Sequence, residues 1–420
     1  MHWLAIVFVI AVASETATRL WLASRQIAAV RAHRNEVPEM FSGQIELADQ
    51  QKAADYTVAR VALSRWVTLF EGAFKLLLTL GGGIAALDAL WRHTRLEEPW
   101  RGALMVGSVF LVLQLAALPF ALWRTFKVEA RFGFNRMSVS LFARDVGKHL
   151  LLAALLGGPV LLAALTLMDH GGDWWWLWAF GLWLAWTLGL TWAAPRFIAP
   201  LFNKFSPLAD GALKTRVEIL LERCGFSARG GVYVMDGSLR SAHGNAYFTG
   251  IGRSKRIVFF DTLLARIETA EIEAVLAHEL GHFRLHHVRQ RLAAMVFMGL
   301  CALALLAWAA RRPEIYGALG VPVPSSATAL LLFIMVVPVF VFFTTPLASW
   351  WSRRQEAAAD EFAAEHTDAG NLITALVKLF RDNATTLTPD RIHSSFFDSH
   401  PPALERIALL NALQAARIAP

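Results

Sequence analysis

Long apolar runs recur along most of the chain and predict helices that cross a lipid bilayer. A helix needs roughly 20 apolar residues to span the hydrocarbon core of a membrane. Seven stretches come near that length, at 3–23, 66–91, 103–123, 149–168, 174–195, 292–310 and 327–348. The first contains Glu15 and Arg19, yet it lacks the basic start and the small-residue cleavage site of a signal peptide. We therefore expect it to be a retained span.

The polar segment 196–291 has a different pattern, which predicts a compact domain outside the bilayer. Residues 208–224 repeat their apolar positions at helical spacing and predict an amphipathic helix. Short runs rich in β-forming residues follow, and we expect a small antiparallel sheet built from 231–235, 245–249 and 256–260.

The composition supports a membrane protein and argues against other classes. Hydrophobic residues make up 56% of the 420 residues, with a mean hydropathy of +0.44, whereas soluble domains contain about 45 to 50% apolar residues. The net charge of +7 comes from Lys and Arg that flank the apolar runs, so we expect no nucleic-acid partner. With two cysteines, Cys224 and Cys301, neither a disulfide framework nor a cysteine-based zinc site is available.

The distribution of basic residues predicts which side of the membrane each loop faces, because cytoplasmic loops are enriched in Lys and Arg. Such residues are frequent between spans one and two and between spans three and four, whereas the turn between spans four and five has none. This places 196–291 and the C-terminal tail in the cytoplasm and the N-terminus outside. Basic residues at 92–101 and 311–312 run against the trend.

The pentapeptide His278-Glu279-Leu280-Gly281-His282 carries the clearest chemical signal. A helix brings residues four apart onto one face, so His278 and His282 can bind one metal ion. Glu279 is then placed as general base, as in the H-E-x-x-H zinc proteases. Thr269 is the predicted N-cap of this helix. The pentapeptide alone leaves open that both histidines are ordinary core or surface residues.

A third ligand must come from elsewhere, because catalytic zinc usually takes three protein ligands. We choose Glu356, just past the seventh span, with Asp360 one helical turn later on the same face. Asp360 suits a hydrogen bond that orients a ligand histidine. The alternative is a solvated charged face, but the three alanines between the two acids favour close packing.

Two further histidines, His286 and His287, compete for the third position. We take both to continue the helix of the motif and expect both to lie at the surface. Zinc is inferred from the types of ligand, since two histidines and a carboxylate can also hold other divalent metals.

Taken together, these motifs give the chain a resemblance to a known family over nearly its whole length. It resembles the integral-membrane type I CAAX prenyl endopeptidases, which are seven-helix zinc proteases of the gluzincin group. Besides the pentapeptide and Glu356 with Ala359-Asp360, the resemblance rests on Phe132-Gly133-Phe134-Asn135, Pro200-Leu201-Phe202-Asn203-Lys204-Phe205, Asn245-Ala246-Tyr247-Phe248-Thr249-Gly250, Arg256-Ile257-Val258-Phe259-Phe260-Asp261-Thr262-Leu263 and Ser399-His400-Pro401-Pro402. Shorter four-span stress proteases share the zinc motif but lack this full set.

The resemblance implies a role for each matching residue. One Zn²⁺ per chain would be bound by His278, His282 and Glu356, with Glu279 as general base and Asp360 orienting a ligand histidine. It further implies that His400 stabilises the tetrahedral oxyanion. Asn245 and Ala246 match an edge strand that pairs with an extended peptide substrate.

The resemblance also implies an architecture. About seven transmembrane helices would enclose a water-filled chamber, lined by intramembrane polar residues such as Glu71, Lys75 and Asp88. We expect a mainly α fold in four parts, listed as an N-terminal membrane domain with about five helices (1–195), a cytoplasmic zinc-peptidase segment with a small β-sheet (196–291), two further transmembrane helices (292–348) and C-terminal cytoplasmic helices (349–420).

The expected substrate is a peptide or protein, and family members act on prenylated C-terminal CAAX peptides in contact with the lipid bilayer. A host without prenyltransferases offers no such peptide, and a general membrane quality-control protease would use the same chemistry. The host decides whether the membrane is a bacterial inner membrane or the endoplasmic reticulum. A catalytically silent scaffold or transporter is the alternative from another class, and it predicts no stoichiometric zinc.

Overall fold

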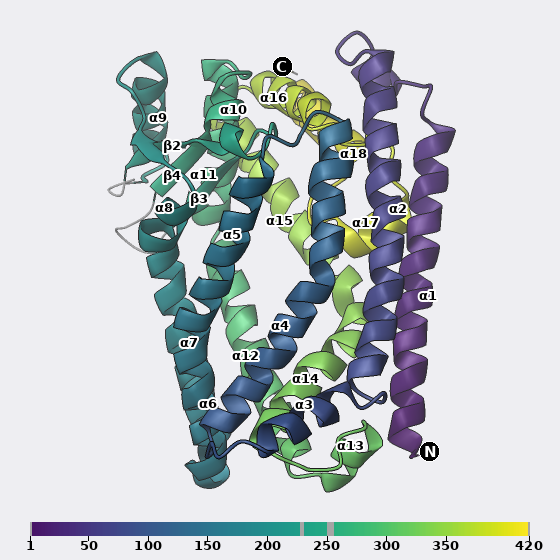
Figure 1. The fold of residues 1–420 in the computed structure, drawn as a ribbon. Helices are drawn as coiled ribbons and strands as arrows, with labels where there is room; N and C mark the ends of the chain where they lie inside the picture. The colour runs from purple at the N-terminus through teal and green to yellow at the C-terminus, as the bar shows by residue number, and fades with distance from the viewer. Residues whose placement is uncertain (1, 227–230, 250–255, 419–420) are drawn as a thin grey trace.

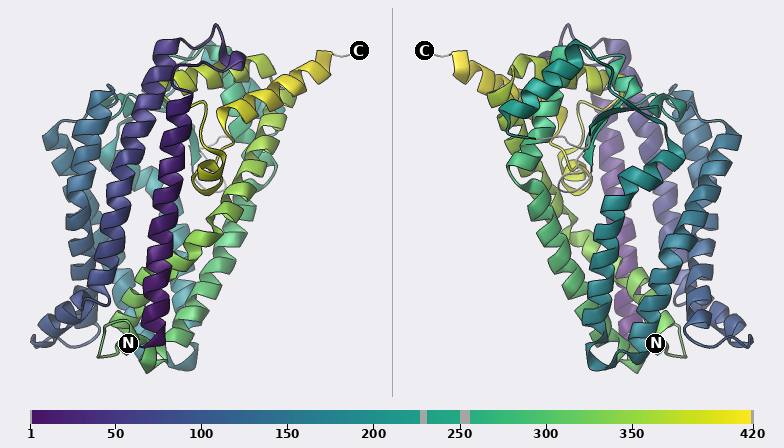
Figure 2. Two further views of the ribbon diagram at one scale, coloured as in Figure 1. Left: turned by 90° about the vertical axis from the view of Figure 1, so that its right-hand side faces the viewer. Right: turned by 90° about the vertical axis from the view of Figure 1, so that its left-hand side faces the viewer.

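The computed structural model describes residues 2–226, 231–249 and 256–418. Long helices run side by side, and a small sheet with several shorter helices lies at one end, which we call the sheet end (Figure 1). The N-terminus lies at the opposite end (Figures 1 and 2). Within the described residues, six helical segments are long and apolar enough to cross a membrane, and a bent pair supplies a seventh. The predicted mainly α membrane fold is confirmed.

Each predicted span corresponds to one of these segments. They are α1 (Trp3–Ala32), α2 with α3 (Leu47–Leu78 and Gly83–Arg92), α4 with the π-helical η2 (Trp100–Trp123 and Arg124–Glu129), α5 and α6 joined by η3 (Val139–Leu152, Gly158–His170 and Ala153–Gly157), α7 with η5 and α8 (Trp175–Ala193, Ala194–Ile198 and Ala199–Phe202), α12 (His287–Ala310), and α14 and α15 joined by η8 (Ser326–Val341, Thr345–His366 and Phe342–Thr344).

The second span is not the continuous helix predicted at 66–91. Helices α2 and α3 are bent by 46° relative to one another. Gly82 has a φ of 80°, in the left-handed region that glycine adopts without a steric penalty, and it ends the helical path just before α3. The signal for this break in the sequence is the run of three glycines at 81–83.

A buried ionic group joins α1 to α2 within the spans. Glu15 accepts hydrogen bonds from Nε of Arg19 at 2.9 Å and from Nζ of Lys75 at 3.2 Å. Such pairing is expected, because an unpaired charge at membrane depth is costly. Of the other two residues predicted to line a chamber, Asp88 is buried and accepts from Nε of Arg92 at 2.7 Å, whereas Glu71 is exposed.

In the described part of the chain the sheet contains four strands in the order β1, β2, β4, β3, with bounds Phe205–Pro207, Val232–Met235, Arg256–Phe260 and Ala246–Thr249 respectively. β1 pairs with β2 and β3 pairs with β4 in antiparallel fashion, but β2 and β4 are parallel. The prediction of an antiparallel sheet is therefore wrong for its central pair. After β2, residues 236–245 lead to β3, which is not the neighbour of β2 in the sheet. The later strand β4 lies between β2 and β3, so β3 is at the edge.

Shorter helices pack around this sheet and form a core with it. They are α9 (Ala212–Arg223), α10 (Asp261–Leu264), α11 (Thr269–Arg284), α16 (Ala369–Asp382) and α18 (Ala403–Ile418). Helix α17 (Arg391–Phe397) packs instead against α1 and α15. The core joins Ile257 and Phe259 of β4 to Leu276 and Leu280 of α11, all nearly inaccessible to solvent. The alternate positions of β4 and the helical spacing of α11 explain why these residues face one another.

A second large core lies at the other end of the long helices. It joins Phe8 of α1, Met105 of α4 and Leu332 of α14 and extends to the helix α13 (Pro313–Ala318). Figure 1 shows α3 and α13 at the end opposite to α10 and α16. The described apolar core is therefore concentrated at the two ends of the molecule.

Candidate metal centre

Helix α11 carries the pentapeptide and begins with a capping box. Glu268 is the N-cap, its side chain accepts from the backbone of Glu271, and Oε2 of Glu271 accepts the backbone N–H of Glu268 at 2.8 Å. The predicted N-cap, Thr269, is the first residue inside the helix, because the Glu268 carboxylate makes the hydrogen bond expected of a threonine hydroxyl. The helix prediction itself holds, and His278 and His282 share one face.

Helix α15 crosses α11 closely at Gly281. A Cβ atom added at Gly281 would lie 3.1 Å from Cα of Ala359 and 3.2 Å from Cβ of Phe362. These distances are shorter than ordinary van der Waals contacts, so a larger side chain at Gly281 would force the helices apart. The small residues Gly281 and Ala359 thus allow α11 and α15 to approach closely enough for side chains of both helices to form one site.

The three predicted ligands come together at this crossing. Their ligand atoms, one each from His278, His282 and Glu356, all lie within 4.8 Å of one another. Nε2 of His278 is 3.3 Å from Oε2 of Glu356, and Nε2 of His282 is 3.4 Å from Oε1. The structure therefore places two imidazoles and one carboxylate around a common point.

This cluster fits a divalent cation. Among the described residues, no donor meets Oε2 of Glu356 in hydrogen-bond geometry, although Nδ1 of His400 lies 2.8 Å away. A carboxylate oxygen buried without such a partner is uncommon and is often explained by an ion. Two imidazole nitrogens and a carboxylate oxygen are a donor set that suits zinc and other divalent metals.

A buried network orients His278. Its Nδ1 lies 2.7 Å from Oδ1 of Asp360, which is completely buried. Arg406 of α18 donates to both oxygens of Asp360, at 2.6 Å from Nε and 2.7 Å from a terminal nitrogen. A carboxylate only accepts hydrogen bonds, so Nδ1 of His278 is the donor in its 2.7 Å contact with Asp360, although a terminal nitrogen of Arg406 also lies 3.1 Å from this Nδ1. This leaves the lone pair of Nε2 on the Glu356 side.

The proton balance of His278 reflects the same network. Burial and the Arg406 guanidinium lower the pKa of His278, but hydrogen bonds to Asp360 and Glu356 outweigh them and raise it above its ordinary value. The site therefore favours the protonated, positively charged form of His278.

Arg406 was not predicted from the sequence. It lies six residues after His400 in an amphipathic helix, and its neighbours Leu410 and Ile407 are in the core. A charged residue among core positions of a helix is the available signal, because a buried arginine needs a partner. Only the fold identifies that partner as Asp360.

The predicted continuation of the motif helix through His286 and His287 is wrong, and so is the predicted exposure of His287, whereas His286 does lie at the surface. Helix α11 ends at Arg284, and His286 adopts a left-handed conformation with a φ of 63°. The chain therefore turns, and His287 is buried with its Nδ1 2.9 Å from Nδ1 of His282, while His286 stays exposed. His287 thus contacts a predicted ligand rather than solvent.

The two predicted catalytic side chains adjoin the cluster in different ways. Glu279 follows His278 on α11 and is half-buried. His400 comes from the loop between α17 and α18, and its side chain is 61% exposed while Nδ1 is 2.8 Å from Oε2 of Glu356. It is therefore the accessible member of a site whose other histidines are enclosed.

Asn245 and Ala246 lie at the edge of the sheet that the described residues form. Ala246 begins β3, whose one described neighbour is β4. Asn245 is exposed, its backbone carbonyl accepts from Phe260, and its side chain accepts from the N–H of Ala246 at 2.8 Å. Phe248 of the same strand packs against Phe283, the residue after His282, with ring centroids 5.0 Å apart. Gly250, which belongs to the same sequence motif, lies outside the described residues.

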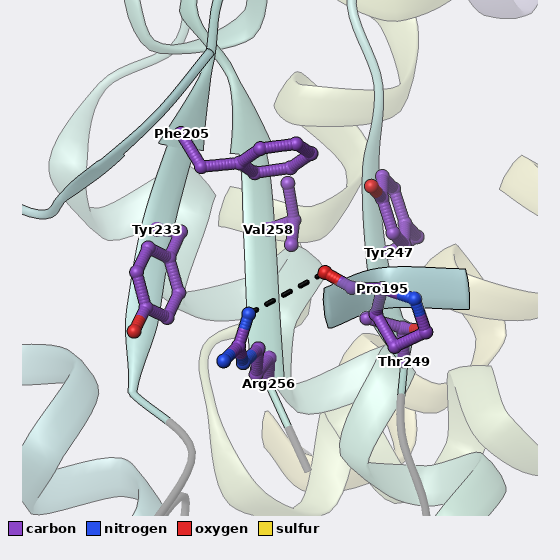
Figure 3. A pocket seen from close by; sticks show the side chains of 7 residues that line it. All are labelled: Pro195, Phe205, Tyr233, Tyr247, Thr249, Arg256 and Val258. Atoms are coloured by element: carbon purple, nitrogen blue, oxygen red, sulfur yellow. Dashed lines mark hydrogen bonds between the residues drawn. The ribbon is translucent and has the colours of Figure 1, made fainter. Parts of the chain in front are cut away.

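A separate small pocket lies where the sheet meets a membrane span (Figure 3). One guanidinium nitrogen of Arg256 donates to the carbonyl oxygen of Pro195 in η5 at 3.4 Å, and Arg256 also stacks on the ring of Tyr233. The pocket contains none of the clustered ligands and is lined by Pro195, Phe205, Tyr233, Tyr247, Thr249, Arg256 and Val258.

Comparisons with known proteins agree with this fold and cluster. A family model described as "CAAX prenyl protease N-terminal, five membrane helices" matches residues 26–204, and one described as "Peptidase family M48" matches residues 207–414. The chain is 31% identical to a CAAX prenyl protease 1 homolog of Homo sapiens over 449 residues, covering 94% of this chain and 93% of that protein. It is 35% identical to a homolog of the same name from Oryza sativa over 309 residues, covering 73% and 72%.

The fold has a counterpart among solved structures. A crystal structure of S. mikatae Ste24p matches with a TM-score of 0.89 and 28% sequence identity, covering 98% of this chain and 99% of that chain. The fold and the cluster together define a multi-pass membrane metallopeptidase. The chain belongs to peptidase family M48 and has the five-helix N-terminal region of CAAX prenyl proteases. The predicted family is confirmed.

The role of Asp360 can be tested by changing Asp360 to Asn. The amide keeps the shape but loses the charge that holds Nδ1 of His278, so we expect metal affinity to fall roughly 10- to 100-fold. The measurement is metal retained by the purified protein in competition with a graded chelator. Glu361→Gln, at an exposed position next along the helix, is the matched control. Unchanged affinity in the Asp360 variant, with the thermal unfolding of both variants near wild type, would contradict the assignment.

Proposed function

We propose that the chain is a zinc endopeptidase at the cytoplasmic membrane face that removes the C-terminal tripeptide of prenylated CAAX proteins. The observation that carries the proposal is the convergence of His278, His282 and Glu356 within 4.8 Å, with Glu279 beside the first of them. Zinc held there would supply Lewis acidity and lower the pKa of water.

The side chains of the site then have separate tasks. Glu279 takes a proton from the attacking water and later gives it to the leaving amine, the role of a general base followed by a general acid. His400 donates a hydrogen bond to the oxyanion of the tetrahedral intermediate. Asp360 holds His278 so that Nε2 faces the metal, and this task is supported by the hydrogen bond of 2.7 Å between them.

The free edge of β3 receives the substrate in this proposal. An extended peptide adds to a sheet edge through main-chain hydrogen bonds, which require little of its sequence. Asn245 and Ala246 lie at the start of that edge, and Phe248 ties the strand to the helix of His282. Peptides bound there would run past the metal cluster with their backbone already ordered.

A chamber between the spans would hold the lipidated part of the substrate. In the segments Val139–His170 and Gly172–Phe202, only 6% of the most apolar window is buried. Helices in a solid bundle bury a broad apolar stripe. The low burial of these two segments is instead what we expect of helices that separate lipid from an internal chamber. The concentration of the apolar cores at the two ends of the molecule also favours a hollow middle.

The orientation follows from the charge distribution and the fold. The basic residues predicted to lie between the first two spans, including Arg31, Arg34 and Lys52, are in or beside the connection between α1 and α2, which lies at the sheet end (Figure 1). Loops rich in such residues face the cytoplasm. The sheet, α11 and the metal cluster would therefore face the cytoplasm, with the N-terminus on the opposite side. The four-part division at 1–195, 196–291, 292–348 and 349–420 remains our proposal for how the chain is organised.

Changing Glu279 to Gln tests the chemistry. The amide cannot accept a proton, so we expect peptidase activity to fall by roughly 10²- to 10⁴-fold, while one zinc per chain is retained. Activity on a fluorogenic peptide and zinc content of the purified protein are the measurements. Glu273→Gln, on the same helix at a surface pair with Arg216, is the matched control. Full turnover by the Glu279 variant would exclude Glu279 as the general base. If the wild-type protein contains no zinc and chelators do not inhibit it, a catalytically silent scaffold is favoured.

A pair of peptides tests the substrate. They share one CAAX sequence, and the cysteine of one is farnesylated. Burying even two methylene groups of the prenyl chain, at about 0.8 kcal/mol each, gives roughly a tenfold preference in kcat/KM. We therefore expect the farnesylated peptide to be cleaved at least about tenfold faster. Equal rates would instead indicate a general membrane protease with the same chemistry.

A further inference from the structure

The loop that carries His400 is short and exposed, yet it must hold its imidazole at a fixed place. A donor to an oxyanion is effective only within narrow limits of distance, and a displacement of about 1 Å can cost up to 10²-fold in rate. His400 is preceded by α17, which ends at Phe397, and followed by Pro401, Pro402 and α18. We therefore asked which contacts fix the two ends of this loop.

Arg353 of α15 fixes the end that precedes His400. One terminal nitrogen of Arg353 donates to the carbonyl oxygens of Ser394 at 3.3 Å and Asp398 at 3.1 Å. The hydroxyl of Ser349, one turn earlier on α15, donates to the carbonyl of Phe396 at 3.3 Å. The carbonyls of Phe396 and Asp398 lie at the C-terminal end of α17, where C=O groups lack a partner within the helix, whereas that of Ser394 also accepts the backbone N–H of Asp398 at 3.0 Å. Two side chains of α15 thus cap the helix that leads into His400.

The start of α17 is fixed by the first membrane helix. Asp390 caps α17 at the N–H of His393 and accepts from Nε and a terminal nitrogen of Arg25, at 3.1 and 2.8 Å. The backbone N–H of Asp390 donates to the side chain of Gln26 at 2.7 Å in a buried contact. Helix α17 is therefore held between α1 and α15.

The end that follows His400 is fixed on α15 as well. Proline restricts its own φ and the conformation of the residue before it, so Pro401 limits the backbone of His400. Arg406 of α18 is clamped to Asp360. Ser349, Arg353, Glu356 and Asp360 recur at alternate spacings of four and three residues, which places all four on one face of α15.

We propose that Arg353 is a positioning residue that places His400 for oxyanion stabilisation, acting through the backbone carbonyls of Ser394 and Asp398. The proposal rests on the function proposed above for His400. In this account one face of α15 provides the metal ligand, orients His278 through Asp360 and sets the loop that brings Nδ1 of His400 to 2.8 Å from Glu356. In this account Arg353 acts on the reaction only through the loop, by its hydrogen bonds to the carbonyls of Ser394 and Asp398.

The test compares Arg353→Ala, His400→Ala and the double variant of the full-length protein with the faster of the two peptides above. We expect Arg353→Ala to lower kcat roughly tenfold with little change in KM or zinc content, because a displaced donor weakens stabilisation of the transition state alone. In the His400→Ala background, removing Arg353 should have no further effect, since residues that act through one another are not additive. Arg353→Lys keeps the positive charge but lacks the planar guanidinium group, so this variant should have a kcat between those of Arg353→Ala and wild type.

Arg354→Ala is the matched control, because Arg354 is the next residue, is exposed and stacks on Trp350. Its kcat should equal that of wild type. If a thermal unfolding assay shows that Arg353→Ala does not fold, Ser349→Ala replaces it in the comparison with His400→Ala and the double variant. We then expect kcat to fall roughly threefold, as for the loss of one uncharged hydrogen bond.

Two kinetic results would overturn the proposal while leaving the proposed function intact: a kcat for Arg353→Ala within twofold of wild type, or losses for Arg353 and His400 that multiply in the double variant. Full kcat in His400→Ala would be different, because it would remove the oxyanion role of His400 and this inference with it. An unchanged affinity of Arg353→Ala for a phosphoramidate peptide, whose oxygens imitate the oxyanion, would also contradict the positioning role.

Discussion

The close crossing of α11 and α15 is the constraint on which the site depends. The helices approach so nearly at Gly281 that an added Cβ atom would lie 3.1 Å from Ala359. Without this approach, Glu356 could not lie beside two imidazoles that belong to a distant part of the chain. The glycine weakens α11 by roughly 1 kcal/mol relative to alanine, so its benefit lies in the contact it permits. The metal cluster is therefore a product of helix packing as much as of the H-E-x-x-H motif.

The C-terminal helices complete what this crossing begins. Arg406 neutralises Asp360 inside the protein, and removing one partner of such a buried pair typically costs about 3 to 5 kcal/mol. That pair also determines which nitrogen of His278 faces Glu356. The contact through which the C-terminal helix α18 is held thus also supports the residue that orients a proposed metal ligand. Beyond this contact α18 stays attached to the end of α15, because Arg417 donates to the carbonyl oxygens of Glu365 at 2.7 Å and Thr367 at 3.3 Å.

The sequence allowed much of the fold and the cluster to be predicted, for physical reasons that also explain the failures. Spans follow from apolar length, and the pair His278 and His282 follows from helical spacing, because both are local properties. Glu356 could be predicted because it lies four residues before Asp360, so that a helix places both acids on one face. The parallel pairing of β2 with β4, the turn at His286 and the partner of Arg406 depend on contacts between distant segments. Such contacts leave only indirect signals in a single sequence, such as the glycines at 81–83 or a charge among core positions.

X-ray absorption at the zinc edge, recorded on the purified full-length protein in a membrane mimetic, tests the central claim most directly. We predict one zinc per chain with nitrogen and oxygen neighbours at about 2.0 to 2.2 Å, two of them imidazoles, and loss of this spectrum in Glu356→Ala. A protein without stoichiometric metal, or a zinc spectrum that is unchanged when Glu356 is removed, would contradict a site shared between α11 and α15.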